Sequence, residues 1–287
     1  MRDSAIRHLA ACDRSPLIAA ALFESTVQIW SLDSSQQIAE FETILDFGGQ
    51  RLVLAAGGKI CITGSWSAGL AAYSVPDGTR LWHLPNFVEV QLLTVDPSGE
   101  RVYCGFESKP LAVVDVETGA VKDTVRGALT VIFSRSSGDR LVVERGMHRI
   151  EGHHELQIPP ESFRVPNAAF SPEAVCIRGT DLRCIDLASG GALWRHTELG
   201  SGSLTFASDH EFYCVAVSAA PPHNASLLRL APNLLDCDLI ARIGRCWETT
   251  FALSGEVLVT ASGGAYETRT GRLLTELKFP QRDYPDR

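Results

Sequence analysis

Short stretches in which hydrophobic and polar residues alternate, each closed by a turn sequence, fill almost the whole chain. The clearest is residues 71–84, AAYSVPDGTRLWHL, where an apolar strand, a Pro-Asp-Gly turn and a second short strand follow one another. Similar stretches begin at Ala112, Arg183 and Ala265, and a looser one begins at Val27. Single strands recur about every 8 to 12 residues, and no long segment has the apolar period of about 3.6 residues that marks a helix. The pattern therefore predicts an all-β protein.

The glycines of these turns reveal a repeat. Gly78 and Gly119 lie 41 residues apart, Gly190 follows 71 residues later, and Gly271 follows after another 81. Each of the longer gaps holds about two units. A hairpin that returns at a nearly fixed period is typical of repeat architectures. Its tryptophan, Trp82 in the clearest copy, is expected to pack between neighbouring units.

The chain divides into seven such units, each with four short strands. Their approximate boundaries are residues 4–42, 43–84, 88–126, 127–161, 162–199, 202–244 and 245–279. This predicts a single domain over residues 1–287, a seven-bladed β-propeller with four antiparallel strands per blade. A β-sandwich is the structural alternative, but it does not explain the repeated order of turns. The first and last units each have four strands of their own, so we expect side-chain packing to join them and residues 281–287 to form a polar tail.

The repeat resembles two groups of known propellers. The segment YSVPDGTRLW from Tyr73 is similar to the repeat of quinoprotein-like (PQQ-like) propellers, whereas DPSGE from Asp96 and FSP from Phe170 resemble WD-repeat propellers. No unit begins with the Gly-His pair of WD repeats, and their Trp-Asp position holds Trp30-Ser31 in the first unit and Val114-Asp115 in the third. The resemblance implies the propeller fold. It does not imply the quinone cofactor, because the chain lacks the adjacent cysteine pair of the quinoprotein enzymes.

Composition narrows the possible partners and location. Lys and Arg number 26 against 34 Asp and Glu, a net charge of −8, whereas general nucleic-acid binding requires a basic face. No signal peptide or membrane span is evident. The eight cysteines form no CxxC pair, and several fall in equivalent apolar strands, which indicates reduced packing residues. We expect a cytoplasmic protein, monomeric apart from a partner that is itself another protein, possibly basic, with no role at membranes or nucleic acid.

Candidate chemistry is sparse. His148, His153 and His154 form the one histidine cluster, but adjacent side chains diverge in strand geometry and no Asp or Cys completes a metal site. Asn167 could be a channel ligand of the kind that lactonase-like propellers use, although a backbone-capping amide is the simpler interpretation. Gly200-Ser201-Gly202-Ser203 lacks the strand-to-helix context of a nucleophile. We therefore expect no catalytic residues, no metal and no cofactor.

The loops offer a candidate binding surface. Those joining second to third strands and outer to inner strands should gather on one face, where aromatic and Arg side chains are the usual anchors of protein interfaces. The alternative for each aromatic residue is packing between blades. The insertion AAPPHNA, residues 219–225, adds a protruding loop in the sixth unit. The candidate partner-binding residues are Trp66, Phe106, Arg145, Arg164, Arg178, His223 and Trp247.

These observations favour a non-catalytic protein-binding propeller. One hypothesis is a dedicated inhibitor, such as a bacterial immunity protein that neutralises a toxin. The alternatives are an adaptor or scaffold in a protein assembly, and a metal-dependent hydrolase or small-ligand binder that uses the channel mouth.

Overall fold

The computed structural model forms two compact units. The first comprises Met1–Arg126, Thr250–Glu267 and Leu273–Arg287, and the second comprises Gly127–Thr249 and Thr268–Arg272. The structure describes residues 2–4, 6–12, 14–22, 25–44, 51–106, 108–134, 139–144, 147–152, 155–158, 167–171, 173–178, 182–196, 204–208, 211–217, 224–230, 237–245, 251–254 and 257–283.

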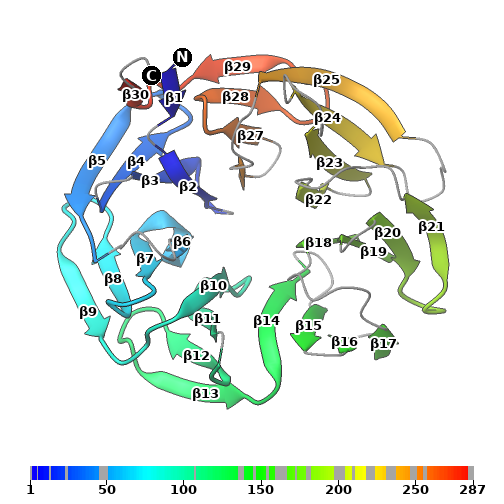
Figure 1. The fold of residues 1–287 in the computed structure, drawn as a ribbon, viewed down its shortest axis with the longest axis horizontal. Helices are drawn as coiled ribbons and strands as arrows, with labels where there is room; N and C mark the ends of the chain where they lie inside the picture. Colours follow the sequence, from blue (N-terminus) through cyan, green and yellow to red (C-terminus); the bar gives the residue numbers. More distant parts are fainter. Residues whose placement is uncertain are drawn as a thin grey trace. The chain divides into compact units, whose positions relative to one another are not determined.

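Four four-stranded antiparallel sheets make up most of the first unit, and each follows chain order (Figure 1). Their strands are β2 (Ile6–Ala11), β3 (Leu17–Leu22), β4 (Thr26–Ser31) and β5 (Gln37–Glu42); β6 (Arg51–Ala55), β7 (Ile60–Gly64), β8 (Leu70–Ser74) and β9 (Arg80–Leu84); β10 (Val90–Val95), β11 (Arg101–Phe106), β12 (Leu111–Asp115) and β13 (Val121–Val125); and β26 (Phe251–Ser254), β27 (Val257–Thr260), β28 (Gly264–Glu267) and β29 (Leu273–Glu276).

The second unit holds three sheets of the same kind. Their strands are β14 (Ala128–Phe133), β15 (Arg140–Glu144), β16 (Met147–Glu151) and β17 (Leu156–Ile158); β18 (Asn167–Phe170), β19 (Ala174–Arg178), β20 (Leu182–Asp186) and β21 (Ala192–His196); and β22 (Leu204–Ser208), β23 (Glu211–Val217), β24 (Asn224–Leu230) and β25 (Cys237–Arg245). Seven consecutive four-stranded antiparallel sheets define a seven-bladed β-propeller, as the repeat predicts. The one helix in the described residues is the short 3₁₀ turn η1 (Ala56–Gly58).

The second strand of the first blade is apolar on both faces because that blade is packed between the second and the last blade. In β3, Ala19 and Ala21 belong to the cluster shared with the second blade, whereas Ile18 and Ala20 belong to the cluster shared with the last blade. Alternation along a strand therefore sends side chains to two cores rather than to one core and solvent. This explains why the second strands read as nearly continuous apolar runs.

The repeated hairpin joins neighbouring blades. Gly119 has a φ of +71°, and a Cβ there would lie 2.8 Å from the Trp82 ring of the preceding blade. Trp82 also donates from Nε1 to the Val116 carbonyl, at 2.8 Å. Asp115 closes the same turn by accepting hydrogen bonds from the Thr118 backbone and hydroxyl, which hold the pKa of its carboxyl below the usual value. The prediction that Trp82 packs between blades is confirmed.

The first and last blades are joined by packing and by a terminal strand pair. Strand β1 (Arg2–Ser4) pairs antiparallel with β30 (Gln281–Asp283), and both chain ends lie beside this pair (Figure 1). Phe279 packs edge-on against Trp30 with ring centroids 5.4 Å apart. The expectation that residues 281–287 are only a polar tail is wrong for residues 281–283, because backbone pairing needs no apolar pattern.

The sixth blade has the longest outer strands. Asn224 and Ala225, expected in the protruding insertion, instead begin β24 and pair with Arg245 and Gly244. Residues 218–223, the rest of that loop, lie outside the described residues.

Most outer strands carry a β-bulge. The register shifts in the last strand pair of every blade except the fourth. In β9 the bulged residue is Leu81, whose side chain is 45% exposed. A bulge twists an edge strand and hinders pairing with other chains, so it protects these otherwise open edges.

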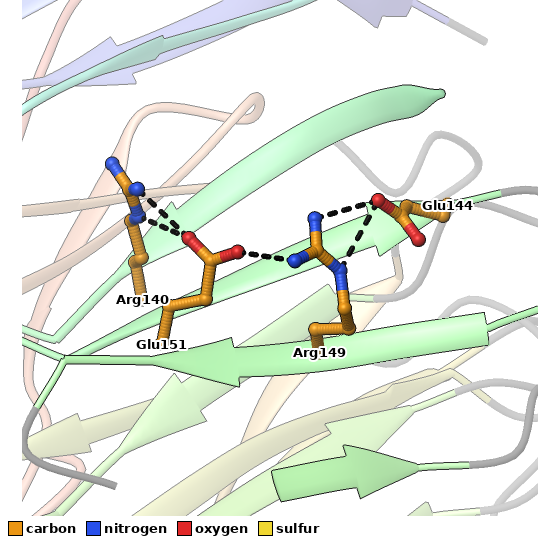
Figure 2. Close-up of polar contacts among 4 residues, drawn as sticks. All are labelled: Arg140, Glu144, Arg149 and Glu151. Atoms are coloured by element: carbon orange, nitrogen blue, oxygen red, sulfur yellow. Dashed lines mark hydrogen bonds and ion pairs between the residues drawn. The ribbon is translucent and has the colours of Figure 1, made fainter. Parts of the chain in front are cut away.

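The fourth blade carries a row of ion pairs on one sheet face (Figure 2). Glu151 Oε2 accepts from Arg140 Nη2 at 2.8 Å, Glu151 Oε1 lies 2.6 Å from Arg149 Nη1, and Glu144 Oε1 accepts from Arg149 Nη2 at 2.7 Å. The opposite face packs Leu141 and other apolar residues against the fifth blade. Because all four charged side chains remain partly exposed, the row adds little to the free energy of unfolding.

Candidate protein-binding surface

Trp66 lies in the loop between β7 and β8 and is 37% exposed. The Ser65 hydroxyl accepts hydrogen bonds from the backbone N–H groups of Ser67, at 3.2 Å, and Ala68, at 2.8 Å. The Ser65 N–H donates to the Gly69 carbonyl at 2.8 Å, which closes the loop. The short loop is therefore held by its own polar groups, and Trp66 remains exposed on it.

Gly69 fixes the end of this loop. Its φ is +94°, and a Cβ would lie 2.3 Å from the Leu84 carbonyl oxygen. Only glycine allows this close approach of the β7–β8 loop to the end of β9. His83 supports the same contact, since its Nε2 lies 2.8 Å from the Ala68 carbonyl oxygen.

Glu89 links the Trp66 loop to two others. Its N–H donates to the Trp66 carbonyl at 2.8 Å, and its carboxylate accepts from the Ser108 hydroxyl at 2.8 Å. Its φ of +63° is unusual for a residue with a side chain, and such strain persists only where surrounding contacts hold it. Three loops, β7–β8, β9–β10 and β11–β12, are thus tied together through one residue.

Aromatic and cationic groups complete the arrangement. Lys109 Nζ donates to the Asn86 carbonyl at 3.2 Å and lies 5.9 Å from the centroid of the Phe106 ring. Phe87 meets Phe106 edge-on at 5.6 Å. The exposed residues of the three loops, which we call the Trp66 surface, are Trp66, Ser67, Pro85, Asn86, Ser108, Lys109 and Pro110.

The structure brings together only part of the predicted site. Phe106 is 4% exposed and belongs to the core between the second and third blades. For this residue the alternative interpretation, packing between blades rather than partner binding, is the one observed. Arg178 ends β19, where its backbone pairs with Asn167 and Leu182. Arg145, Arg164, His223 and Trp247 lie outside the described residues, as do His153 and His154 of the histidine cluster.

Sequence reasoning missed Asn86, Lys109 and Pro110. Their loops were identified, but the contact between Lys109 and Asn86 joins positions 23 residues apart, and nothing in either segment indicates it. The usable signal is position in the sequence: Asn86 directly precedes Phe87, and Lys109 lies three residues after Phe106.

The described cysteines behave as packing residues. Cys12, Cys61, Cys104, Cys176, Cys184 and Cys214 are buried. Burial raises the pKa of Cys61 and Cys104 far above the usual value and that of Cys184 to about 12. Such thiols are poor nucleophiles. Within the described residues no three His, Cys, Asp or Glu side chains gather to hold a metal, and no helix is long and apolar enough to cross a membrane.

His8 lies on the inner strand β2, next to the strand β6 that carries Arg51. Burial, aided by the charge of Arg51, lowers the pKa of His8 from 6.5 to about 4. Burial also lowers the pKa of Arg51. His8 is therefore neutral in the folded protein at neutral pH.

We expect this histidine to make the fold sensitive to acid. Between pH 6.5 and 4 the unfolded chain binds a proton that the folded chain does not, so the free energy of unfolding falls as pH falls. At about 1.4 kcal/mol per pKa unit the loss is roughly 3 kcal/mol. Urea unfolding at pH 7 and pH 4.5 should show a smaller decrease for His8→Gln than for the wild type. Equal decreases for both proteins would contradict this assignment.

Comparison with known proteins identifies the fold of the chain but does not place it in a family. No family model and no curated protein matches the chain. The WD40 repeats of RRP9 are 14% identical with a TM-score of 0.67, covering 97% of this chain and 95% of that one. A chain of the mitotic checkpoint complex is 15% identical with a TM-score of 0.65, covering 94% and 90%. BamB from Moraxella catarrhalis is 12% identical with a TM-score of 0.59, covering 92% and 80%. The chain thus shares its propeller fold with both WD40 and BamB proteins.

Proposed function

We propose that this chain is a non-catalytic protein-binding propeller and that the Trp66 surface contacts its partner. The observation that carries the proposal is the exposed Trp66 indole on a loop already fixed by hydrogen bonds. A tryptophan presented in this way can be buried by a partner at a small cost in conformational entropy. Lys109 and Asn86 supply polar groups around it, as in the rim of protein interfaces.

The net charge of −8 supports a basic partner, because opposite charge accelerates association. We therefore favour a dedicated inhibitor of a basic protein, such as an immunity protein that neutralises a toxin in the cytoplasm. The propeller in the mitotic checkpoint complex belongs, by its name, to an assembly, which supports an adaptor role as the second form of the proposal. The two forms differ in outcome: an inhibitor abolishes its partner's activity at a 1:1 ratio, whereas an adaptor leaves that activity intact.

Replacement of Trp66 tests the surface. We expect Trp66→Ala to weaken partner binding at least tenfold, because loss of a buried interface tryptophan costs about 2 kcal/mol or more. The matched control is Leu81→Ala, which removes an exposed apolar side chain from the bulge of β9 and should change binding less than twofold. Affinity capture followed by titration of the captured protein measures both.

Partner affinities are compared only for variants whose unfolding temperature equals that of the wild type. Unchanged affinity of Trp66→Ala, or an equal loss in Leu81→Ala, would exclude the Trp66 surface as the contact. A photoreactive residue at position 109 should cross-link to the same protein, whereas one at position 81 should not.

A further inference from the structure

A cavity of about 310 Å³ lies where three consecutive inner strands end, and it is separate from the Trp66 surface. It is lined by the final residues of β2, β6 and β10 and by the turns that follow them. Strand β10 begins beside Ser65, whose carbonyl accepts from the Val90 N–H at 3.4 Å, and ends at the cavity. The two features therefore lie at opposite ends of the strand.

The cavity wall combines apolar side chains with backbone polar groups. Val53, Leu93 and Val95 line it and are partly exposed. Each of β2, β6 and β10 is the first strand of its sheet and pairs with a strand on one side only. Their other edges leave backbone N–H and C=O groups without a strand partner, which can hydrogen-bond to a ligand.

The rim is rigid because three turns lock together. The Ala56 N–H donates to the Gly99 carbonyl at 3.1 Å, and Arg14 Nη2 donates to the Pro97 carbonyl. Gly58 approaches the first turn so closely that a Cβ would lie 2.4 Å from the Ser15 hydroxyl oxygen. A cavity held by such contacts is already formed before a ligand arrives, which lowers the cost of binding.

Arg14 gives the cavity its charge. Its guanidinium is exposed at the rim, and among the described residues it forms no ion pair. Asp96 also lines the cavity, but its carboxylate accepts hydrogen bonds from residues of its own turn. It accepts hydrogen bonds from the Ser98 hydroxyl at 2.8 Å and from the Glu100 and Arg101 N–H groups at 3.1 Å. The cavity therefore presents the Arg14 guanidinium, which pairs with no carboxylate among the described residues, beside an apolar wall.

We propose that this cavity binds a small aliphatic carboxylate of about four to six carbons. The carboxylate pairs with the Arg14 guanidinium, whose planar fork suits two parallel hydrogen bonds. The hydrocarbon chain lies against Val53, Leu93 and Val95. This site is independent of the proposed protein contact.

Hexanoate titrated into the full-length protein tests the proposal by two-dimensional NMR. We expect a Kd on the order of 1 mM, with amide shifts centred on Ala10, Ala56 and Thr94. Hexanol and hexylamine, which keep the chain but not the negative charge, should bind at least tenfold more weakly.

Two arginine variants give the matched comparison. Arg14→Gln should weaken hexanoate binding at least tenfold. Arg126→Gln should change it less than twofold, because Arg126 is an equally exposed arginine of the first unit that does not line the cavity. The proposal is overturned if hexanoate does not bind at 20 times the expected Kd, if hexanol binds as tightly, or if Arg14→Gln has no effect. Trp66→Ala should leave hexanoate binding unchanged. A negative result with hexanoate would therefore leave the proposed protein contact at the Trp66 surface unaffected.

Discussion

Phe279→Ala is expected to destabilise the protein by about 3–5 kcal/mol, the usual cost of removing a buried phenylalanine ring. The side chain is 4% exposed and packs on Trp30 within a cluster that contains both first-blade and last-blade residues. Its loss removes apolar contact between the two ends of the chain and leaves a void. Thermal unfolding should occur about 10 °C lower, since one kcal/mol corresponds to about 2–4 °C in a chain of this size.

The control is Leu274→Ala, which removes an apolar side chain of the neighbouring strand β29 that is 44% exposed. It should lower the unfolding temperature by less than 2 °C, because little area is removed from the core. Hydrogen exchange in Phe279→Ala should accelerate first in the strands of the first and last blades. If Phe279→Ala and Leu274→Ala unfold at the same temperature, packing at Phe279 does not join the blades.

Gly119→Ala is expected to cost about 2–4 kcal/mol for two separate reasons. A residue with a Cβ loses roughly 1–2 kcal/mol in holding the left-handed φ of +71°. The added Cβ would also lie 2.8 Å from the Trp82 ring, so the indole must move and stretch its hydrogen bond to Val116. Urea unfolding of the variant measures the combined cost.

Gly57→Ala separates the two causes. Gly57 has nearly the same φ, +66°, but no atom lies within 4 Å of the point that a Cβ would occupy, so the cost there is backbone strain alone. The cost of Gly119→Ala measured in a Trp82→Ala background should fall to that of Gly57→Ala, because the clash has been removed. An unchanged cost in that background would show that the contact between blades does not restrict residue 119.

The strands could be predicted because alternation and turn chemistry are local. Asp96-Pro97-Ser98-Gly99 and Asp115 to Gly119 are turns whose side chains and glycines determine the backbone path, and the strands between them follow. The joining of the chain ends was not predictable. Residues 281–283 are polar, and they pair with residues 2–4 from the other end of the sequence, which no local pattern indicates.

The candidate site was predictable at the level of loops but not of side chains. Trp66 follows the apolar strand β7 and Phe106 ends the apolar strand β11, yet Trp66 is exposed and the Phe106 ring fills a core. The difference arises from the neighbouring blade, because Phe106 belongs to a core cluster that includes Ile62 and Leu70 of the second blade. The role of Glu89, which depends on a left-handed backbone and partners in two other loops, has no signal in the sequence.

Hydrogen exchange in the partner complex most directly tests whether the Trp66 surface is the protein contact. With saturating partner, amides in residues 65–69, 85–89 and 108–110 should exchange at least fivefold more slowly. The turns at the opposite ends of the strands, residues 33–36 and 76–79, should exchange as in the free protein. Slower exchange in those turns, with no change in the three loops, would contradict binding through the Trp66 surface.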